Sequence, residues 1–192
     1  MLDNEILLEP GLKDIELKNK EIIAKMKTIL NEPTLTMKNF TQRVYYPLVV
    51  EKELGLNNSV GITKEELETI EKIANQIDPF FYALEYRKLI GGNLLKQISL
   101  KFENSRPHWE TPNLFPYSTY QKVSFYSLDH PSFSGLLSAL GSPLPRIPHF
   151  GESLQIVFSD SDEGYEVSFF LGQSEFSVCK NSNVCSYNDF KK

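Results

Sequence analysis

The stretch Tyr126–Gly141, YSLDHPSFSGLLSALG, decides the fold, because a strand and a helix meet inside it. Val123–Ser127 is rich in β-branched and aromatic residues and predicts a buried strand. Pro131–Leu140 is largely apolar and predicts a short helix that a glycine ends. The polar pair Asp129 and His130 stands at the junction of the two elements. These two residues are the candidate site, and their position allows either chemistry or helix capping.

The capping interpretation rests on the order Asp129-His130-Pro131. Proline is favoured in the first turn of a helix, and the residue before that turn commonly accepts hydrogen bonds from its amides. In this interpretation Asp129 or His130 only starts the helix. The serines that follow do not form Gly-x-Ser-x-Gly, so the sequence does not predict a serine hydrolase.

A hairpin is predicted farther along the chain. Ser153–Ser159 and Tyr165–Leu171 alternate or run apolar, and the turn-forming Asp160–Gly164 separates them. The carboxylates of that segment lack the full ligand spacing of a calcium loop, so we interpret it as a solvated hairpin turn.

Two cysteines, Cys179 and Cys185, lie in CKNSNVC near the end of the chain. Their spacing suits a small disulfide loop, and it equally suits two free thiols in a reducing compartment. No pair of histidines lies nearby to complete four ligands, so a zinc site is not expected. We predict no metal and no cofactor.

The part of the chain before residue 105 is predicted to be mainly helical. Residues 12–31 place their apolar side chains roughly on one side and Lys and Glu on the other, which predicts an amphipathic helix. A second helix is predicted over about Thr36–Leu54, which Pro47 kinks or splits because proline lacks the backbone donor and clashes with the preceding turn.

Two further helices are predicted in the same part. Thr63 and Glu66 have the spacing of a capping box, and the helix that starts there should end near Ile77, before Asp78-Pro79. The last helix is predicted over Leu89–Glu103 and contains two adjacent glycines.

These elements predict a single domain over 1–192 of the α/β or α+β class, with a helical first half packed on a small mixed sheet. Residues 12–104 form the helical part, 105–120 a loop, 121–178 the strand, helix and hairpin, and 179–192 a C-terminal tail.

Charge and composition narrow the function. The formal net charge is −5, which disfavours nucleic acid as a partner because phosphate binding needs clustered Lys and Arg. No apolar run approaches the ~20 residues of a membrane span. The N-terminus lacks the basic region and long apolar stretch of a signal peptide, so the sequence assigns no compartment.

Five blocks of the chain carry a resemblance to a known family: Arg43–Leu48, Lys88–Leu95, Tyr126–Leu140, Ile147–Ser153 and Cys179–Phe190. In their order they resemble blocks of the histidine acid phosphatases, branch two of the histidine phosphatase superfamily. The resemblance corresponds to the second half of the family's catalytic region. It implies a histidine-phosphatase-like but incomplete fold, and it favours a Cys179–Cys185 disulfide. Members of the family are mostly secretory, lysosomal or periplasmic.

The resemblance also implies a damaged active site. The family uses a His-Asp pair at this place, whereas here the order is Asp129 then His130. Its nucleophilic histidine belongs to an Arg-His-Gly motif, and no such motif occurs in the 192 residues. Phosphoryl oxygens are usually held by arginine, and the chain has only four scattered arginines.

We therefore expect a catalytically inactive, truncated phosphatase-like protein that binds a protein or a ligand, with Asp129 and His130 as remnants. The alternative is an active acid phosphomonoesterase, alone or completed by a second chain. The aromatic residues of the 105–120 segment either contact a partner or cover the strand that the missing half leaves exposed, and self-association is the natural consequence of such an edge. They are Trp109, Phe115, Tyr117 and Tyr120.

Overall fold

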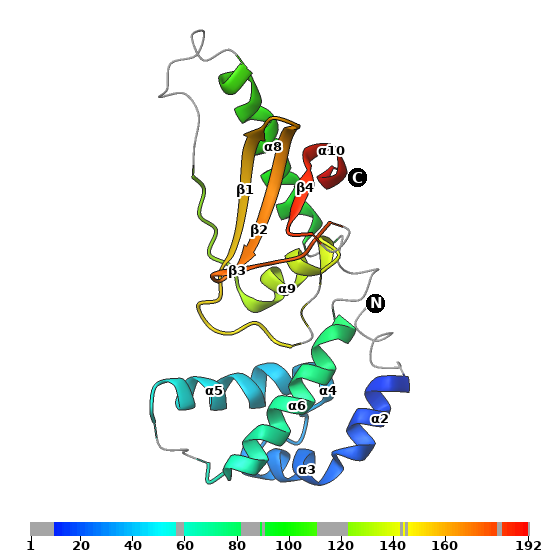
Figure 1. Ribbon diagram of the computed structural model, residues 1–192. Coiled ribbons are helices and arrows are strands. Elements are labelled where there is room, and N and C mark those ends of the chain that lie inside the picture. Colours follow the sequence, from blue (N-terminus) through cyan, green and yellow to red (C-terminus); the bar gives the residue numbers. More distant parts are fainter. Residues whose placement is uncertain are drawn as a thin grey trace. The chain divides into compact units, whose positions relative to one another are not determined.

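The computed structural model describes residues 10–56, 60–81, 89, 91–110, 123–142, 144, 146–179 and 182–191. It has an α+β fold, in which helices accompany a small antiparallel sheet (Figure 1). We predicted one domain, and the chain divides into two compact units. The first comprises Met1–Ala83 with Pro145–Ile147, and the second comprises Leu84–Leu144 with Pro148–Lys192.

The first unit begins with two helices where we predicted one. Helix α2 spans Pro10–Lys18 and α3 spans Lys20–Ile29, so the amphipathic stretch is divided at Asn19. The side-chain amide of Asn19 donates to the carbonyl of Ile15 at 2.8 Å. Asparagine competes in this way with backbone hydrogen bonding, which explains the break.

The predicted second helix is divided into three short pieces. Helix α4 spans Met37–Phe40, the π-helix η1 spans Thr41–Tyr45 and α5 spans Tyr46–Glu53. The amide of Tyr46 donates to the carbonyl of Thr41, five residues earlier. Pro47 explains the wider turn, because its ring has no amide hydrogen and clashes with the carbonyl four residues before it. The helix is therefore interrupted just before Pro47, where we predicted that the proline kinks or splits it.

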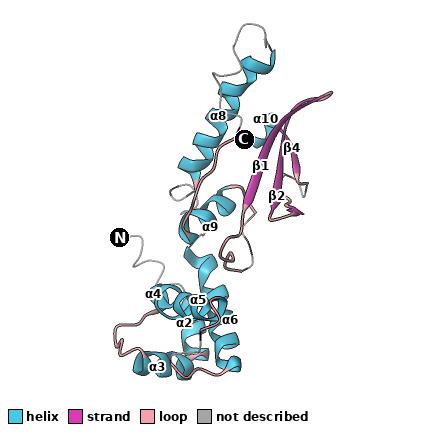
Figure 2. Ribbon diagram, turned by 90° about the vertical axis from the view of Figure 1, so that its left-hand side faces the viewer, coloured by secondary structure: helices cyan, strands magenta, loops and turns pink. Residues whose placement is uncertain are grey.

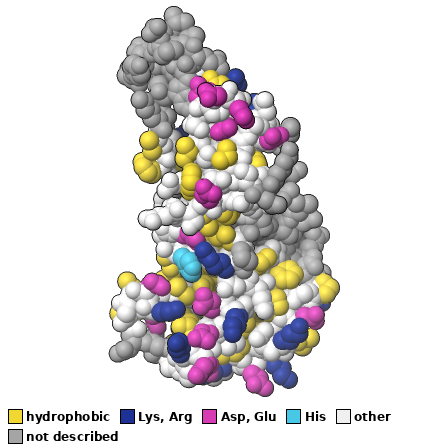
Figure 3. Space-filling view, viewed as in Figure 1, with side chains coloured by type: hydrophobic (Ala, Val, Ile, Leu, Met, Phe, Trp, Pro, Cys, Tyr) yellow, Lys and Arg dark blue, Asp and Glu magenta, His cyan; other side chains and the backbone are white. Residues whose placement is uncertain are grey.

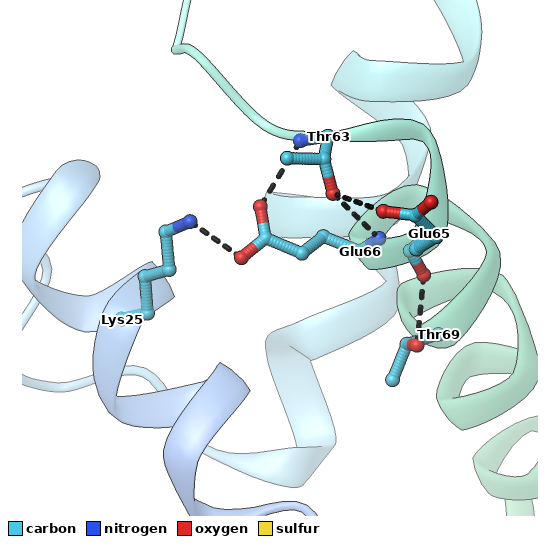
Figure 4. A network of polar contacts seen from close by, with 5 residues as sticks. All are labelled: Lys25, Thr63, Glu65, Glu66 and Thr69. Atoms are coloured by element: carbon cyan, nitrogen blue, oxygen red, sulfur yellow. Dashed lines mark hydrogen bonds and ion pairs between the residues drawn. The ribbon is translucent and has the colours of Figure 1, made fainter.

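Helix α6 spans Lys64–Phe81 and starts at the predicted capping box (Figure 4). The hydroxyl of Thr63 accepts from the amide of Glu66 at 3.2 Å, and the carboxylate of Glu66 accepts from the amide of Thr63 at 3.0 Å. Glu66 also accepts from Lys25 Nζ at 2.5 Å, which links α3 to the start of α6. The bond from Lys25 lowers the pKa of the Glu66 carboxyl. The capping box is confirmed.

The prediction that α6 ends before Asp78-Pro79 is wrong, since the helix continues through Pro79 to Phe81. Ile73 and Ile77 are buried at 1% and 0% exposure, whereas Pro79 lies on the exposed side. Packing of the apolar face outweighs the one backbone bond that proline removes.

The core of the first unit forms around α6, with α2, α3 and α5 gathered about it in Figure 1. Ile147 belongs to this core although it is distant in sequence: it is 3% exposed, and its amide donates to the side chain of Asn75 at 2.8 Å. The other buried apolar residues include Leu12, Ile23, Met26, Leu35, Met37, Phe40, Val44, Leu48, Ile62, Ile70, Ile73, Ala74 and Ile77.

The second unit holds the predicted hairpin. Strands β1 (Leu154–Ser161) and β2 (Gly164–Leu171) pair antiparallel, and the register ends at Ser161 opposite Gly164. Strands β3 (Ser174–Glu175) and β4 (Val184–Ser186) also pair antiparallel with β2. The predicted hairpin is confirmed. We expected a mixed sheet, but every strand pairing among the described residues is antiparallel.

Helix α8 (Gly92–Glu110) lies along one face of the hairpin in both ribbon views (Figures 1 and 2). An aromatic cluster joins them: the Phe158 ring lies 4.8 Å from the Phe102 ring, 5.0 Å from Tyr187 and 5.4 Å from Tyr165. Val167 and Phe169 of β2 are fully buried in this core. Burying one face of the sheet against the helix gives the unit its own core.

Two predicted segments need correction. The prediction of a loop over 105–120 is wrong for its first residues, because α8 continues to Glu110. Residues 111–120 lie outside the described residues. The 179–192 segment is not a simple tail, since it forms β4 and helix α10 (Tyr187–Phe190). Tyr187 is 3% exposed and its hydroxyl donates to the carbonyl of Ser99 in α8. Burial against α8 and β2 explains the order of this segment.

No helix in the described part of the chain has the length and apolar character needed to cross a membrane.

Candidate functional site

Asp129 is the N-cap of helix α9, which spans His130–Ala139. Its backbone is extended, and its carboxylate accepts a hydrogen bond from the amide of Ser132 at 3.0 Å. This is the geometry of a capping residue, which satisfies one of the amides that a helix start leaves without a partner. The capping interpretation of the Asp129-His130-Pro131 order is therefore confirmed.

The electrostatics of Asp129 match this role. The side chain and the backbone amide of Ser132 hold the pKa of the Asp129 carboxyl below its ordinary value, and the neighbouring His130 lowers it further. A helix N-terminus carries partial positive charge that favours a carboxylate over a carboxylic acid. Asp129 is therefore a fixed anion at the start of α9.

His130 is the first residue of α9 and is half-buried. Its Nδ1 atom lies 3.4 Å from the hydroxyl oxygen of Ser134, one turn later in the same helix. Ser134 is itself buried, with 8% of its surface exposed. The structure therefore directs the imidazole toward a hydroxyl of its own helix, and Asp129 and His130 each interact with α9.

The segment before this pair, which we predicted as a buried strand, is neither buried nor a strand. Residues 123–129 belong to no helix or strand, and Phe125 is 94% exposed. One side of the segment contacts α8, where Lys101 Nζ donates to the hydroxyl of Ser124 at 2.9 Å and lies 5.1 Å from the centre of the Tyr126 ring. The composition indicated strand propensity, which becomes a strand only where another strand pairs with it.

The arginines that the structure describes are engaged elsewhere. Arg43 forms an ion pair with Glu32 in the first unit. Arg106 forms an ion pair with Glu103 and lies 5.0 Å from the ring centre of Tyr165 in the second unit. Arg146 donates to the carbonyl of Ile147. Arg87 lies outside the described residues.

Cys179 and Cys185 form a disulfide, with their Cα atoms 5.5 Å apart. Cys185 is 2% exposed and lies in β4 opposite Val167. The bond therefore holds the segment that carries β4 and α10 against the core of the second unit.

Among the residues that the structure describes, no three His, Cys, Asp or Glu side chains lie close enough together to hold a metal ion. On the face seen in Figure 3, acidic and basic side chains are interspersed in the region of the first unit.

Of the aromatic residues proposed as contacts, Trp109 lies within α8, and Phe115, Tyr117 and Tyr120 lie outside the described residues.

Comparison with protein-family models finds no match, and comparison with curated proteins finds none either.

Sequence reasoning missed Val123 and Phe125 as candidate contact residues. It interpreted them as core because Val and Phe are commonly buried in strands. The residues Val123-Ser124-Phe125-Tyr126-Ser127 do not alternate strictly between apolar and polar, so the sequence pattern gave no signal that Val123 and Phe125 are exposed.

Proposed function

We propose that this chain is a catalytically inactive, histidine acid phosphatase-like domain that acts by binding another protein. The observation that carries the proposal is the use of Asp129 as a helix cap, with its carboxylate bonded to the amide of Ser132. In the resembled family this position carries a histidine that assists attack on phosphorus. A capping carboxylate supplies no such assistance.

The charge of Asp129 also opposes phosphate binding. Its lowered pKa keeps it ionised at acid pH, where such phosphatases would act. Two like unit charges ~4 Å apart repel by roughly 4 kcal/mol at an effective dielectric of ~20. The amide of Ser132, which a bound anion would use at a helix N-terminus, already donates to Asp129.

Support for binding comes from the apolar side chains that the second unit exposes. Phe125 is 94% exposed, Phe150 61% and Val123 59%. Aromatic side chains that become buried on association contribute much of the binding free energy of protein interfaces. Val123 and Phe125 lie two positions apart on one segment, and neighbouring exposed apolar side chains commonly mark an interaction site.

The catalytic half of the proposal is tested with a chromogenic aryl phosphate at acid pH. Wild-type protein, Asp129→Ala and His130→Ala should all release the aryl alcohol at the rate of a protein-free blank. Turnover by the wild type that both substitutions abolish would overturn the proposal and favour an acid phosphomonoesterase.

The binding half is tested with immobilised wild-type protein and immobilised Phe125→Asp as baits. A partner recovered by the wild type and lost with Phe125→Asp is the expected result. No recovered protein, together with a monomer in light scattering, contradicts it.

A further inference from the structure

The antiparallel sheet of the second unit has two faces of different character. Successive side chains of a strand point to opposite faces, and residues directly opposite one another in an antiparallel pair share a face. The register therefore assigns Val167, Phe169 and Cys185 to one face, where they are at most 2% exposed and pack with Phe102 of α8. In Figure 2 α8 lies on this side of the strands, and no described helix lies on the other side.

The other side of the sheet, here called the outer face, consists of three rows of side chains that the register aligns across the strands. The rows are Val157, Ser168 and Val184; Gln155, Phe170 and Glu175; and Ser159, Glu166 and Ser186. Val157 is 43% exposed, Val184 is 37% exposed and Phe170 is half-buried. The outer face is therefore open to solvent and carries apolar side chains in two neighbouring rows.

The same part of the chain carries its negative charge. The stretch 151–179 contains no Lys, Arg or His, and its acidic residues are Glu152, Asp160, Asp162, Glu163, Glu166 and Glu175. Its formal charge of −6 exceeds in magnitude the −5 of the whole chain. Glu166 and Glu175 belong to the outer face, and Asp162 and Glu163 are exposed in the turn between β1 and β2. None of the ion pairs formed among the described residues uses these four carboxylates. In Figure 3 hydrophobic and acidic side chains lie next to one another over the strands.

We propose that the outer face binds a basic amphipathic helix of another protein. A helix about 10 Å wide fits over two to three strands about 4.8 Å apart, which is how α8 covers the opposite face. The apolar stripe of the bound helix contacts Val157, Phe170 and Val184. Lys or Arg residues beside the stripe lie next to Glu166 and Glu175, and this charge complementarity selects a basic partner and disfavours an acidic one.

Charge also excludes pairing of two outer faces from two copies of this chain. Such a contact brings carboxylates against carboxylates, and 151–179 offers no base to either copy. The surface goes beyond the proposed function, whose binding evidence is Phe125. The segment that carries Phe125 contacts α8 through Ser124 and Lys101, and α8 packs on the opposite face of the sheet.

Fluorescence anisotropy tests the proposal with a labelled synthetic helical peptide, whose leucines recur every three or four residues and whose flanking positions are lysine. The matched peptide carries glutamate in place of each lysine. The wild-type protein should bind the lysine peptide saturably and about tenfold or more tightly than the glutamate peptide, and the ratio should shrink as salt screens the charges. No saturable binding of the lysine peptide, or equal affinity for the two peptides, overturns the proposal.

Two pairs of variants locate the binding surface. Val157→Ser should weaken binding of the lysine peptide about fivefold, because it removes apolar contact area. Val50→Ser is its control: Val50 lies in the first unit, is 40% exposed, and should bind as the wild type does. Glu166→Gln should weaken binding severalfold in about 0.1 M salt, where charges act over about 10 Å. Glu53→Gln, the same change at an exposed position of α5, should not. Circular dichroism checks that all four variants are folded, and equal effects within either pair overturn the proposed surface.

These outcomes are distinguishable from failure of the proposed function. Neither the phosphatase assay nor the recovery of a partner that Phe125→Asp loses depends on the outer face. A protein that hydrolyses the aryl phosphate and binds the lysine peptide overturns only the proposed function. An inactive protein that does not bind the lysine peptide overturns only the docking of a basic helix.

Discussion

At the residue scale, the carboxylate of Asp129 stabilises the start of helix α9. Its oxygen accepts from the Ser132 amide, and its pKa is lowered by that residue. A carboxyl whose pKa is lower in the folded than in the unfolded protein stabilises the fold above its unfolded pKa. That contribution disappears as the pH falls through the folded pKa.

Asp129→Ala should lower the free energy of unfolding by about 1 kcal/mol at neutral pH, the usual cost of losing an N-cap. The difference from the wild type should shrink in acid, as the wild-type carboxylate is protonated. Urea unfolding at several pH values measures both effects. Asp129→Ser keeps a capping oxygen and is the control, which should stay close to the wild type at neutral pH. An alanine variant as stable as the wild type at neutral pH would rule out the capping role.

At the scale of elements, the close crossing of α8 and α9 depends on glycine. A Cβ atom placed on Gly91, just before α8, would lie 2.1 Å from the carbonyl oxygen of Gly135 in α9. Backbone atoms cannot move aside as a flexible side chain can. Gly91 therefore allows the start of α8 to lie close to the backbone of α9.

Gly91→Ala should destabilise the second unit by at least the 1–3 kcal/mol that is roughly typical of overpacking. The expected result is a lower thermal midpoint, measured by circular dichroism. Asn93→Ala, at the exposed second residue of α8, should leave the midpoint nearly unchanged. A Gly91→Ala midpoint equal to that of Asn93→Ala contradicts the close-approach argument.

At the scale of the whole molecule, the two compact units each have a core of their own. Phe40 is fully buried in the first unit and Phe169 in the second. Removing a buried phenylalanine side chain costs about 3–5 kcal/mol, because it loses apolar burial and leaves a cavity. Because each unit has its own core, losing a side chain from one core should lower the stability of that unit and leave the other unit's stability unchanged.

Phe40→Ala should therefore accelerate amide hydrogen exchange in α6 while β1 and β2 keep their protection. Phe169→Ala should have the opposite pattern. Exchange measured by mass spectrometry on peptides from both units distinguishes the cases. Equal loss of protection in both units from either variant would show that they unfold as one.

The parts of the fold that the sequence predicted well depend on neighbours within a few residues. The Thr63–Glu66 capping box and the Asp129 cap each close over three positions, so their partners are visible in the sequence. The β1–β2 hairpin is similarly local, because a short turn sets its register. The Cys179–Cys185 disulfide is also local, because its two cysteines are only 6 positions apart in the sequence.

The parts that the sequence misplaced depend on distant neighbours. Helix α6 continues through Pro79 because its apolar face is buried, which no local rule indicates. The C-terminal segment is ordered by contacts such as Tyr187 with Ser99, 88 positions apart. The first-unit core takes in Ile147 through the side chain of Asn75, 72 positions away.

The sequence by itself determined the capping box of α6, the cap of α9, the hairpin and the place of the candidate pair, because hydrogen bonds between residues close in sequence dictate them. Only the tertiary structure decided that the chain forms two compact units and that residues 123–128 form no strand and leave Phe125 exposed. Strand propensity is a property of residues, whereas a strand needs a second strand to receive its backbone bonds. Whether such a partner is present depends on how the whole chain folds.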